Sequence, residues 1–71
     1  MDVLVFITSV EKPEQVHLVK PLLTAVPSIK EWNFDLDDCD NILRIESIDL
    51  PPKYIEVLLQ TAGFDCRELN Y

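Results

Sequence analysis

The sequence has few of the features that would assign it to a specialised class. It contains one glycine and two cysteines among 71 residues. Two cysteines are too few for the disulfide framework of a small secreted domain, so we expect Cys39 and Cys66 to be reduced thiols. No apolar run approaches the roughly 20 residues that span a bilayer. The N-terminus also lacks a basic leader with a small-residue cleavage site, and we therefore expect a cytoplasmic location.

Basic residues are scarce as well. Six lysines and arginines stand against thirteen acidic residues, which gives a formal net charge of −7. This charge repels the phosphate groups of nucleic acids and of anionic membranes, so both are excluded as expected partners. The hydrophobic content of 48% is spread along the chain and predicts one folded domain over residues 1–71.

Hydrophobic patterning predicts four strands. Five consecutive apolar residues indicate a buried strand over residues 3–7, and period-two alternation indicates a second strand over 29–36. β-Branched composition predicts a third strand over 42–48, joined to the second by a hairpin turn at the acidic residues 37–41. We expect Leu43 and Ile45 to share its buried face. A fourth strand is predicted over 64–69.

A first helix is predicted to begin at Pro13, where a proline is tolerated because its missing N–H would be unpaired. Pro21 lies within this helix and predicts a bend. The buried stripe is predicted at Val16, Val19, Leu23 and Val26, widened by Leu18, Leu22 and Ala25.

A second helix is predicted to open at Pro51 and Pro52, with Asp49 as its N-terminal cap. The lone glycine, Gly63, is expected to end it in the left-handed conformation, with Phe64 packing behind the cap. The buried face is predicted at Ile55, Leu58, Leu59 and Ala62.

The order strand, helix, strand, strand, helix, strand predicts an α+β fold, the ferredoxin-like βαββαβ sandwich. Right-handed crossovers then give an antiparallel sheet of strand order 4-1-3-2 with both helices on one face.

With this element order, the strand entry from Ile29 to Leu36 and the helix ending Thr61-Ala62-Gly63-Phe64, the chain resembles the heavy-metal-associated domain. This is the fold of copper chaperones and of N-terminal modules of metal-pumping ATPases, and the resemblance covers nearly all 71 residues. The family carries a Met-x-Cys-x-x-Cys motif in the loop after its first strand. The matching residues here are Ile7-Thr8-Ser9-Val10-Glu11-Lys12.

The resemblance therefore places Ser9 and Lys12 where the two cysteines would be, and Ile7 where the methionine would pack. Soft thiolates select Cu(I) or Zn(II), and neither a hydroxyl nor an ammonium group replaces them. We expect no metal at this loop and no cofactor.

The other candidate ligands are weaker. Cys39 and Cys66 are predicted on different parts of the sheet, roughly 14 Å apart, which is too far for a disulfide or a shared metal ion. We expect Cys66 to be a small buried side chain facing the helices. The acidic run around Cys39 loosely resembles a calcium loop, but Asp40 stands where such a loop needs glycine, so a solvated turn is favoured.

No catalytic set is apparent. His17, the only histidine, is predicted on the outer face of its helix, and no base is expected near Ser9. Acylphosphatase-type enzymes share the general fold but use an arginine-bearing phosphate loop, and residues 8–12 contain neither arginine nor glycine. We therefore expect that the protein is not an enzyme.

The open face of the sheet is the remaining candidate surface. If Val3, Val5 and Ile7 point at the helices, then Leu4 and Phe6 lie on the open face with Ile42 and Arg44, near Glu31, Asn33 and Glu46. Apolar residues rimmed by charge are typical of protein contacts. We therefore predict a small non-catalytic interaction module that binds a protein partner or forms a homodimer. The alternative is a copper- or zinc-binding protein with substituted ligands drawn from Cys39, its neighbours Asp37 and Asp40, or His17.

Overall fold

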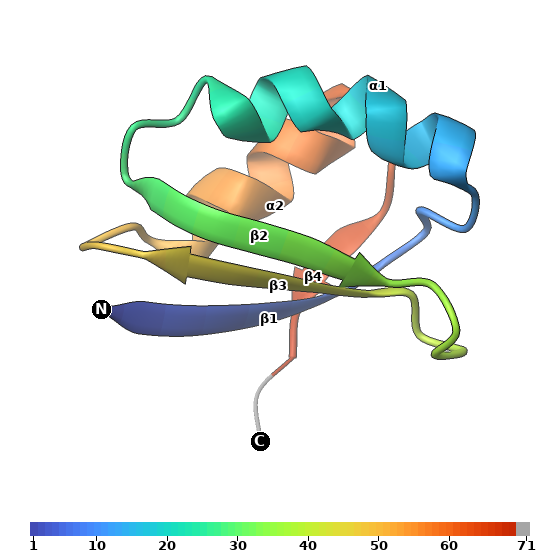
Figure 1. The fold of residues 1–71 in the computed structure, drawn as a ribbon, viewed down its shortest axis with the longest axis horizontal. Coiled ribbons are helices and arrows are strands. Elements are labelled where there is room, and N and C mark those ends of the chain that lie inside the picture. The colour runs from blue at the N-terminus through green and yellow to red at the C-terminus, as the bar shows by residue number, and fades with distance from the viewer. Residues whose placement is uncertain (70–71) are drawn as a thin grey trace.

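The computed structural model describes residues 1–69 and contains the six predicted elements in the predicted order (Figure 1). They are β1 (Asp2–Thr8), α1 (Pro13–Thr24), β2 (Ile29–Asp35), β3 (Ile42–Ser47), α2 (Pro52–Thr61) and β4 (Cys66–Glu68). β4 is shorter than predicted. Within residues 1–69, neither helix combines the length and the apolar content needed to cross a bilayer.

The four strands form one antiparallel sheet in the order β2-β3-β1-β4. This is the predicted order 4-1-3-2, counted from the opposite edge, so the ferredoxin-like fold is confirmed. Figure 1 shows both helices on the same side of the sheet. Among residues 1–69 no helix lies on the opposite side, and we call that side the open face.

The register of the strands corrects the predicted orientation of β1. Leu4 pairs with Ile45 and Phe6 pairs with Leu43, so each shares a sheet face with its partner. Leu43 and Ile45 are fully buried, and Phe6 is 0% exposed in the same core. Leu4 and Phe6 therefore point toward the helices, and the prediction that they lie on the open face is wrong.

The alternate residues of β1 take the open face instead, because successive side chains of a strand point to opposite sides. They are Val3, Val5 and Ile7, paired across the ladder with Glu46, Arg44 and Ile42. The register places Ile42 and Arg44 on the open face as well. Ile42 is only 4% exposed, yet it is not part of the main core.

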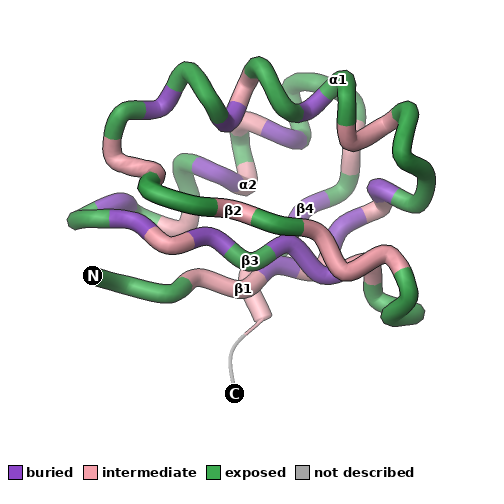
Figure 2. Tube along the Cα trace, in the orientation of Figure 1, coloured by how far each residue is buried: buried purple, intermediate pink, exposed green. Residues whose placement is uncertain are grey.

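The core lies between the sheet and the two helices, and buried positions alternate with less buried ones along β3 from Leu43 to Ser47 (Figure 2). From α1 it takes Val19 and Leu23, with Val16 partly buried against them. Leu18 is 65% exposed, so the prediction that it widens the buried stripe is wrong. The helix continues past Pro21, whose carbonyl accepts a hydrogen bond from the N–H of Ala25 at 3.2 Å.

The two ends of α2 differ in how well they match the prediction. Its N-cap is Pro51, whereas Asp49 lies outside the helix with a φ of 52°, so Asp49 does not cap it. The C-terminal end is as predicted. Gly63 has a φ of 95° and donates to the carbonyl of Gln60 at 3.0 Å, and Phe64 donates to Leu59 at 3.0 Å. These two bonds form the Schellman motif, behind which Phe64 packs on the core.

Candidate functional site

The loop between β1 and α1 is joined by hydrogen bonds to the loop between α2 and β4. The Ser9 hydroxyl accepts a hydrogen bond from the Asp65 N–H at 2.8 Å, and the Ser9 N–H donates to the Asp65 carbonyl at 3.1 Å. These bonds join two loops that are 56 residues apart in the sequence. The Ser9 oxygen therefore already has a structural role at the place where the resemblance puts a metal ligand.

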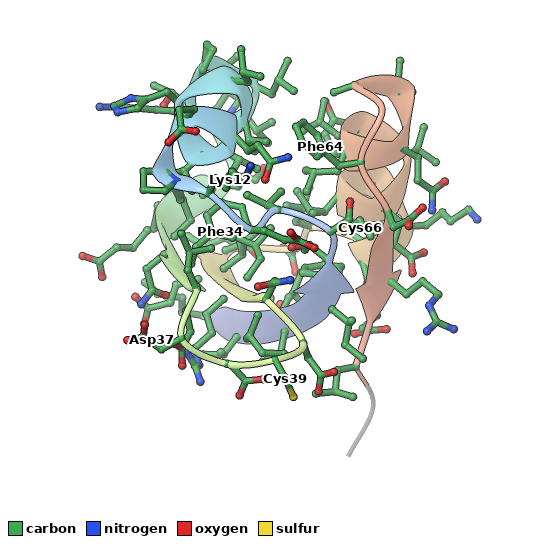
Figure 3. The ribbon with its side chains drawn as sticks, turned by 90° about the vertical axis from the view of Figure 1, so that its right-hand side faces the viewer. Lys12, Phe34, Asp37, Cys39, Phe64 and Cys66 are labelled. Atoms are coloured by element: carbon green, nitrogen blue, oxygen red, sulfur yellow. The ribbon has the colours of Figure 1, made fainter. Side chains whose placement is uncertain are left out.

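Lys12 occupies the N-cap of α1 and is exposed (Figure 3). The Gln15 side-chain oxygen accepts the N–H groups of Glu11 at 2.7 Å and of Lys12 at 3.0 Å. Gln15, which the sequence reasoning did not single out, thus satisfies the start of the helix. Ile7 is half-buried on the open face, between Ile42 and Arg67, and is not part of the core.

Thr8 fixes the hairpin tip and was also missed. Its hydroxyl donates to the Asn41 carbonyl at 2.7 Å and accepts the Val10 N–H at 3.2 Å, while its own N–H donates to Asp40 at 3.3 Å. The signal for it was a polar residue on the core-facing side of an apolar strand, where a hydroxyl needs partners.

The tip itself gathers three ligand-type side chains. Oxygen or sulfur atoms of Asp38, Cys39 and Asp40 lie within 4.8 Å of one another, and all three residues are exposed. Asp37, which the sequence suggested, is not in this group. The Asp38 carboxylate accepts the Asp40 N–H at 2.9 Å, and the Asp38 carbonyl accepts the Asn41 N–H at 3.0 Å. The acidic run thus makes the predicted turn, with Asp38 organising its backbone.

The two cysteines are both free, and their surroundings differ (Figure 3). Cys39 is exposed at the hairpin tip, whereas Cys66 is 1% exposed in the core, as predicted. Burial, with a further contribution from the charge of Glu56, raises the pKa of the Cys66 thiol to about 12. Cys66 is therefore a protonated, inert side chain at neutral pH. His17 is exposed, as predicted.

The edge strand β4 is held by α2. The Gln60 side-chain N–H donates to the Cys66 carbonyl at 3.0 Å, and a Glu56 carboxylate oxygen accepts the Glu68 N–H at 2.9 Å. Side chains of α2 thus satisfy backbone groups of this edge strand, which discourages another strand from pairing there.

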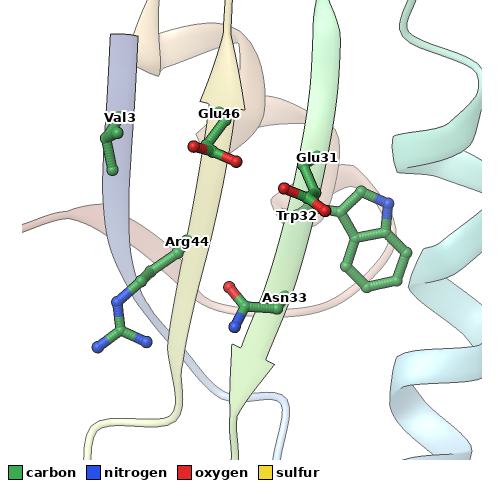
Figure 4. A pocket seen from close by; sticks show the side chains of 6 residues that line it. All are labelled: Val3, Glu31, Trp32, Asn33, Arg44 and Glu46. Atoms are coloured by element: carbon green, nitrogen blue, oxygen red, sulfur yellow. The ribbon is translucent and has the colours of Figure 1, made fainter.

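The open face carries a shallow hollow of about 380 Å³ (Figure 4). It is lined by Val3, Glu31, Trp32, Asn33, Arg44 and Glu46. Glu31 and Glu46 are direct cross-strand partners, and Figure 4 shows their carboxyl groups pointing toward each other. A hydrogen bond with Glu31, then burial and the like charge of Glu31, raise the pKa of Glu46. The Arg44 side chain extends away from both carboxyl groups.

A second hollow of about 710 Å³ lies on the helical side. Its lining is mainly apolar and comprises Leu22, Pro51, Lys53, Tyr54, Val57, Leu58, Thr61 and Ala62. Tyr54 and Val57 are about half exposed, at 50% and 47%. The helical spacing of the sequence did not single out either residue.

Solved structures with this fold include the following two. The apo form of the HMA domain of a copper chaperone for superoxide dismutase matches 96% of this chain with a TM-score of 0.78 at 19% identity. The present chain spans 66% of that chain. The N-terminal domain of ZntA in its Zn(II) form matches 93% of this chain and 89% of its own, with a TM-score of 0.77 at 13% identity.

These likenesses establish that the chain has the fold of heavy-metal-associated domains, as the sequence predicted. No family model matches the chain, and no curated protein matches it.

Proposed function

We propose that this protein is a non-catalytic binding module on the heavy-metal-associated fold, which holds no metal ion in its first loop and contacts a protein partner through its open sheet face. The observation that carries the proposal is the side chain of Ser9. Its hydroxyl bonds to Asp65, and it stands with Lys12 where two thiolates would be needed.

Chemistry supports the loss of the metal site. Cu(I) is held by soft thiolates, and Zn(II) by several thiolate, imidazole or carboxylate ligands together; residues 7–12 offer only the single carboxylate of Glu11. The exposed ammonium group of Lys12 adds a positive charge where a cation would have to sit. Catalysis lacks support for a related reason: the Ser9 hydroxyl is bonded to a backbone N–H and not to a base.

The open face supports the binding role. Val3 is 61% exposed on it, beside charged residues of both signs. Apolar and charged side chains side by side on an uncovered sheet face fit a transient protein interface, which is about as polar as the rest of a protein surface. We also propose a cytoplasmic location, which the exposed free thiol of Cys39 supports because such thiols persist in a reducing compartment.

The competing candidate is copper or zinc binding at the hairpin tip. The specific observation in its favour is the grouping of Asp38, Cys39 and Asp40 within 4.8 Å. Two carboxylates and one thiolate would suit Zn(II) better than Cu(I).

An amide chemical-shift titration with Cu(I) and Zn(II) under reducing conditions tests the proposal. We expect no saturable shifts at residues 7–12 of the wild type. The matched control is the double variant Ser9→Cys/Lys12→Cys, which should gain saturable Cu(I) shifts at those residues because it restores the thiolate pair.

Saturable shifts at residues 7–12 of the wild type would refute the proposal. Saturable shifts confined to residues 37–41 at micromolar metal would favour the competing candidate instead.

A further inference from the structure

The open face is organised in rows that run across the strands. One row consists of Val3 on β1, its cross-strand partner Glu46 on β3, and the next partner, Glu31, on β2. The next row consists of Val5 on β1, its partner Arg44 on β3, and Asn33 on β2. We call these the carboxylate row and the guanidinium row. They are adjacent, because each strand advances by two residues between them.

Each row leaves a charge without a counterpart of opposite sign beside it. Like charges directly opposite each other destabilise a sheet, and the carboxylate row contains such a pair in Glu31 and Glu46. In the guanidinium row Arg44 faces only Val5 and Asn33 across the ladder, and its side chain extends away from the carboxyl groups. The face therefore displays the two halves of a salt bridge that it does not form within one chain.

We propose that two copies of this chain stack their open sheet faces across a two-fold axis that runs perpendicular to the strands, between the carboxylate row and the guanidinium row. This inference rests on the proposed function, since it names the partner of the same face. Rotation about that axis places the carboxylate row of one copy opposite the guanidinium row of the other copy. Arg44 then faces Glu46, Asn33 faces Glu31, and Val3 faces Val5.

This arrangement is isologous, as closed dimers require. A two-fold axis along the strands would instead lay carboxylates on carboxylates. A strongly basic partner would satisfy Glu31 and Glu46 but would leave Arg44 facing another cation. The net charge of −7 opposes self-association only weakly at physiological salt, because charges farther apart than about 8 Å are screened.

The size of the face sets the strength of the contact. Three strand spacings of about 4.8 Å and a seven-residue strand at about 3.3 Å per residue give a face of roughly 14 by 23 Å. Two such faces bury about 640 Å² together, which is below the roughly 1,200 Å² of stable specific contacts, so we expect a weak dimer with a dissociation constant on the order of 10⁻⁵ to 10⁻⁴ M.

Sedimentation velocity over loading concentrations from about 10 µM to about 1 mM tests the dimer. The wild type should shift from monomer to dimer across this range. Arg44→Glu and Glu46→Arg should each weaken the dimer at least about tenfold, because each places like charges opposite one another. The double variant Arg44→Glu/Glu46→Arg should restore it to within about threefold, since the swapped charges again meet their opposites.

Lys53→Glu is the matched control, because it makes the same charge change as Arg44→Glu on the helical side of the molecule. It should leave the dimer unchanged. Circular dichroism of every variant establishes that its fold is intact.

Three results would overturn the inference: a wild type that stays monomeric at the highest concentration, a dimer indifferent to the single reversals, or a double variant that fails to recover. The second result would place the contact elsewhere, such as along the outer edge of β2. None of these results bears on the first loop, so the metal titration tests separately the part of the proposed function that denies a metal ion there. A dimer that fails these tests would leave a different protein as the partner of the open face.

Discussion

Truncating Phe6 and Val3 to alanine should cost the fold very different amounts, although both lie on β1. Phe6 is 0% exposed and Val3 is 61% exposed on the opposite face. Phe6→Ala leaves a cavity in the core and should cost about 3–5 kcal/mol. Val3→Ala removes methyl groups that are mostly in water and should cost about 0.5 kcal/mol or less.

These amounts are large compared with the stability of so small a chain. At about 0.05–0.15 kcal/mol per residue, a 71-residue domain has roughly 4–11 kcal/mol. Phe6→Ala could therefore remove most of it, and Phe6→Leu, with an expected loss of about 1 kcal/mol, is the more measurable variant. Urea unfolding followed by Trp32 fluorescence gives each value. With a slope of about 1 kcal/mol per molar urea, Phe6→Leu should lower the midpoint by about 1 M.

Val3→Ala should barely move that midpoint. Equal losses at the two positions, or a larger loss for Val3→Ala, would refute the orientation of β1 and with it the composition of the open face.

Three further predictions concern single residues. The raised pKa of Glu46 means that the native state binds more protons than the unfolded state, so its contribution to stability falls as pH rises above about 4.5. Glu31→Gln should therefore stabilise the fold at pH 7 and much less at pH 4, as urea unfolding at both values would measure. A thiol reagent at pH 8 should modify Cys39 quickly and Cys66 only on unfolding, because a pKa of about 12 leaves roughly one thiolate in 10⁴. Gly63→Ala should cost about 1–2 kcal/mol in thermal unfolding from backbone strain alone, since a Cβ there would meet nothing within 4 Å.

Elements with local signals were predictable from the sequence. The end of α2 depends on Gly63 and its neighbours, and β2 depends on alternation within one segment. The orientation of β1 was not predictable in this way, because residues 3–7 are all apolar and show no alternation. Their inward side is set by pairing with Leu43 and Ile45, which lie about 40 residues away in the sequence.

In the candidate site, too, some features have a local signal in the sequence and others depend on residues far away in it. The resemblance to the family motif singled out Ser9 and Lys12, and both lie between β1 and α1. The bond from Ser9 to Asp65 joins residues 56 apart, so no local pattern reveals it. The pairing of Glu31 with Glu46 depends on the register after an irregularity between Ile29 and Glu31, which shifts the strand by one residue. A shift of one residue exchanges the two faces of a strand.

Competition for Cu(I) against a colorimetric chelator tests the central claim most directly, because it reports whether the first loop can hold a soft cation at all. Both proteins should carry Cys39→Ser, so that the exposed thiol of the hairpin does not contribute. We predict that the otherwise wild-type chain leaves the chelator spectrum unchanged, while the Ser9→Cys/Lys12→Cys chain removes about one Cu(I) per molecule. Removal of one Cu(I) by the chain that retains Ser9 and Lys12 would contradict the account.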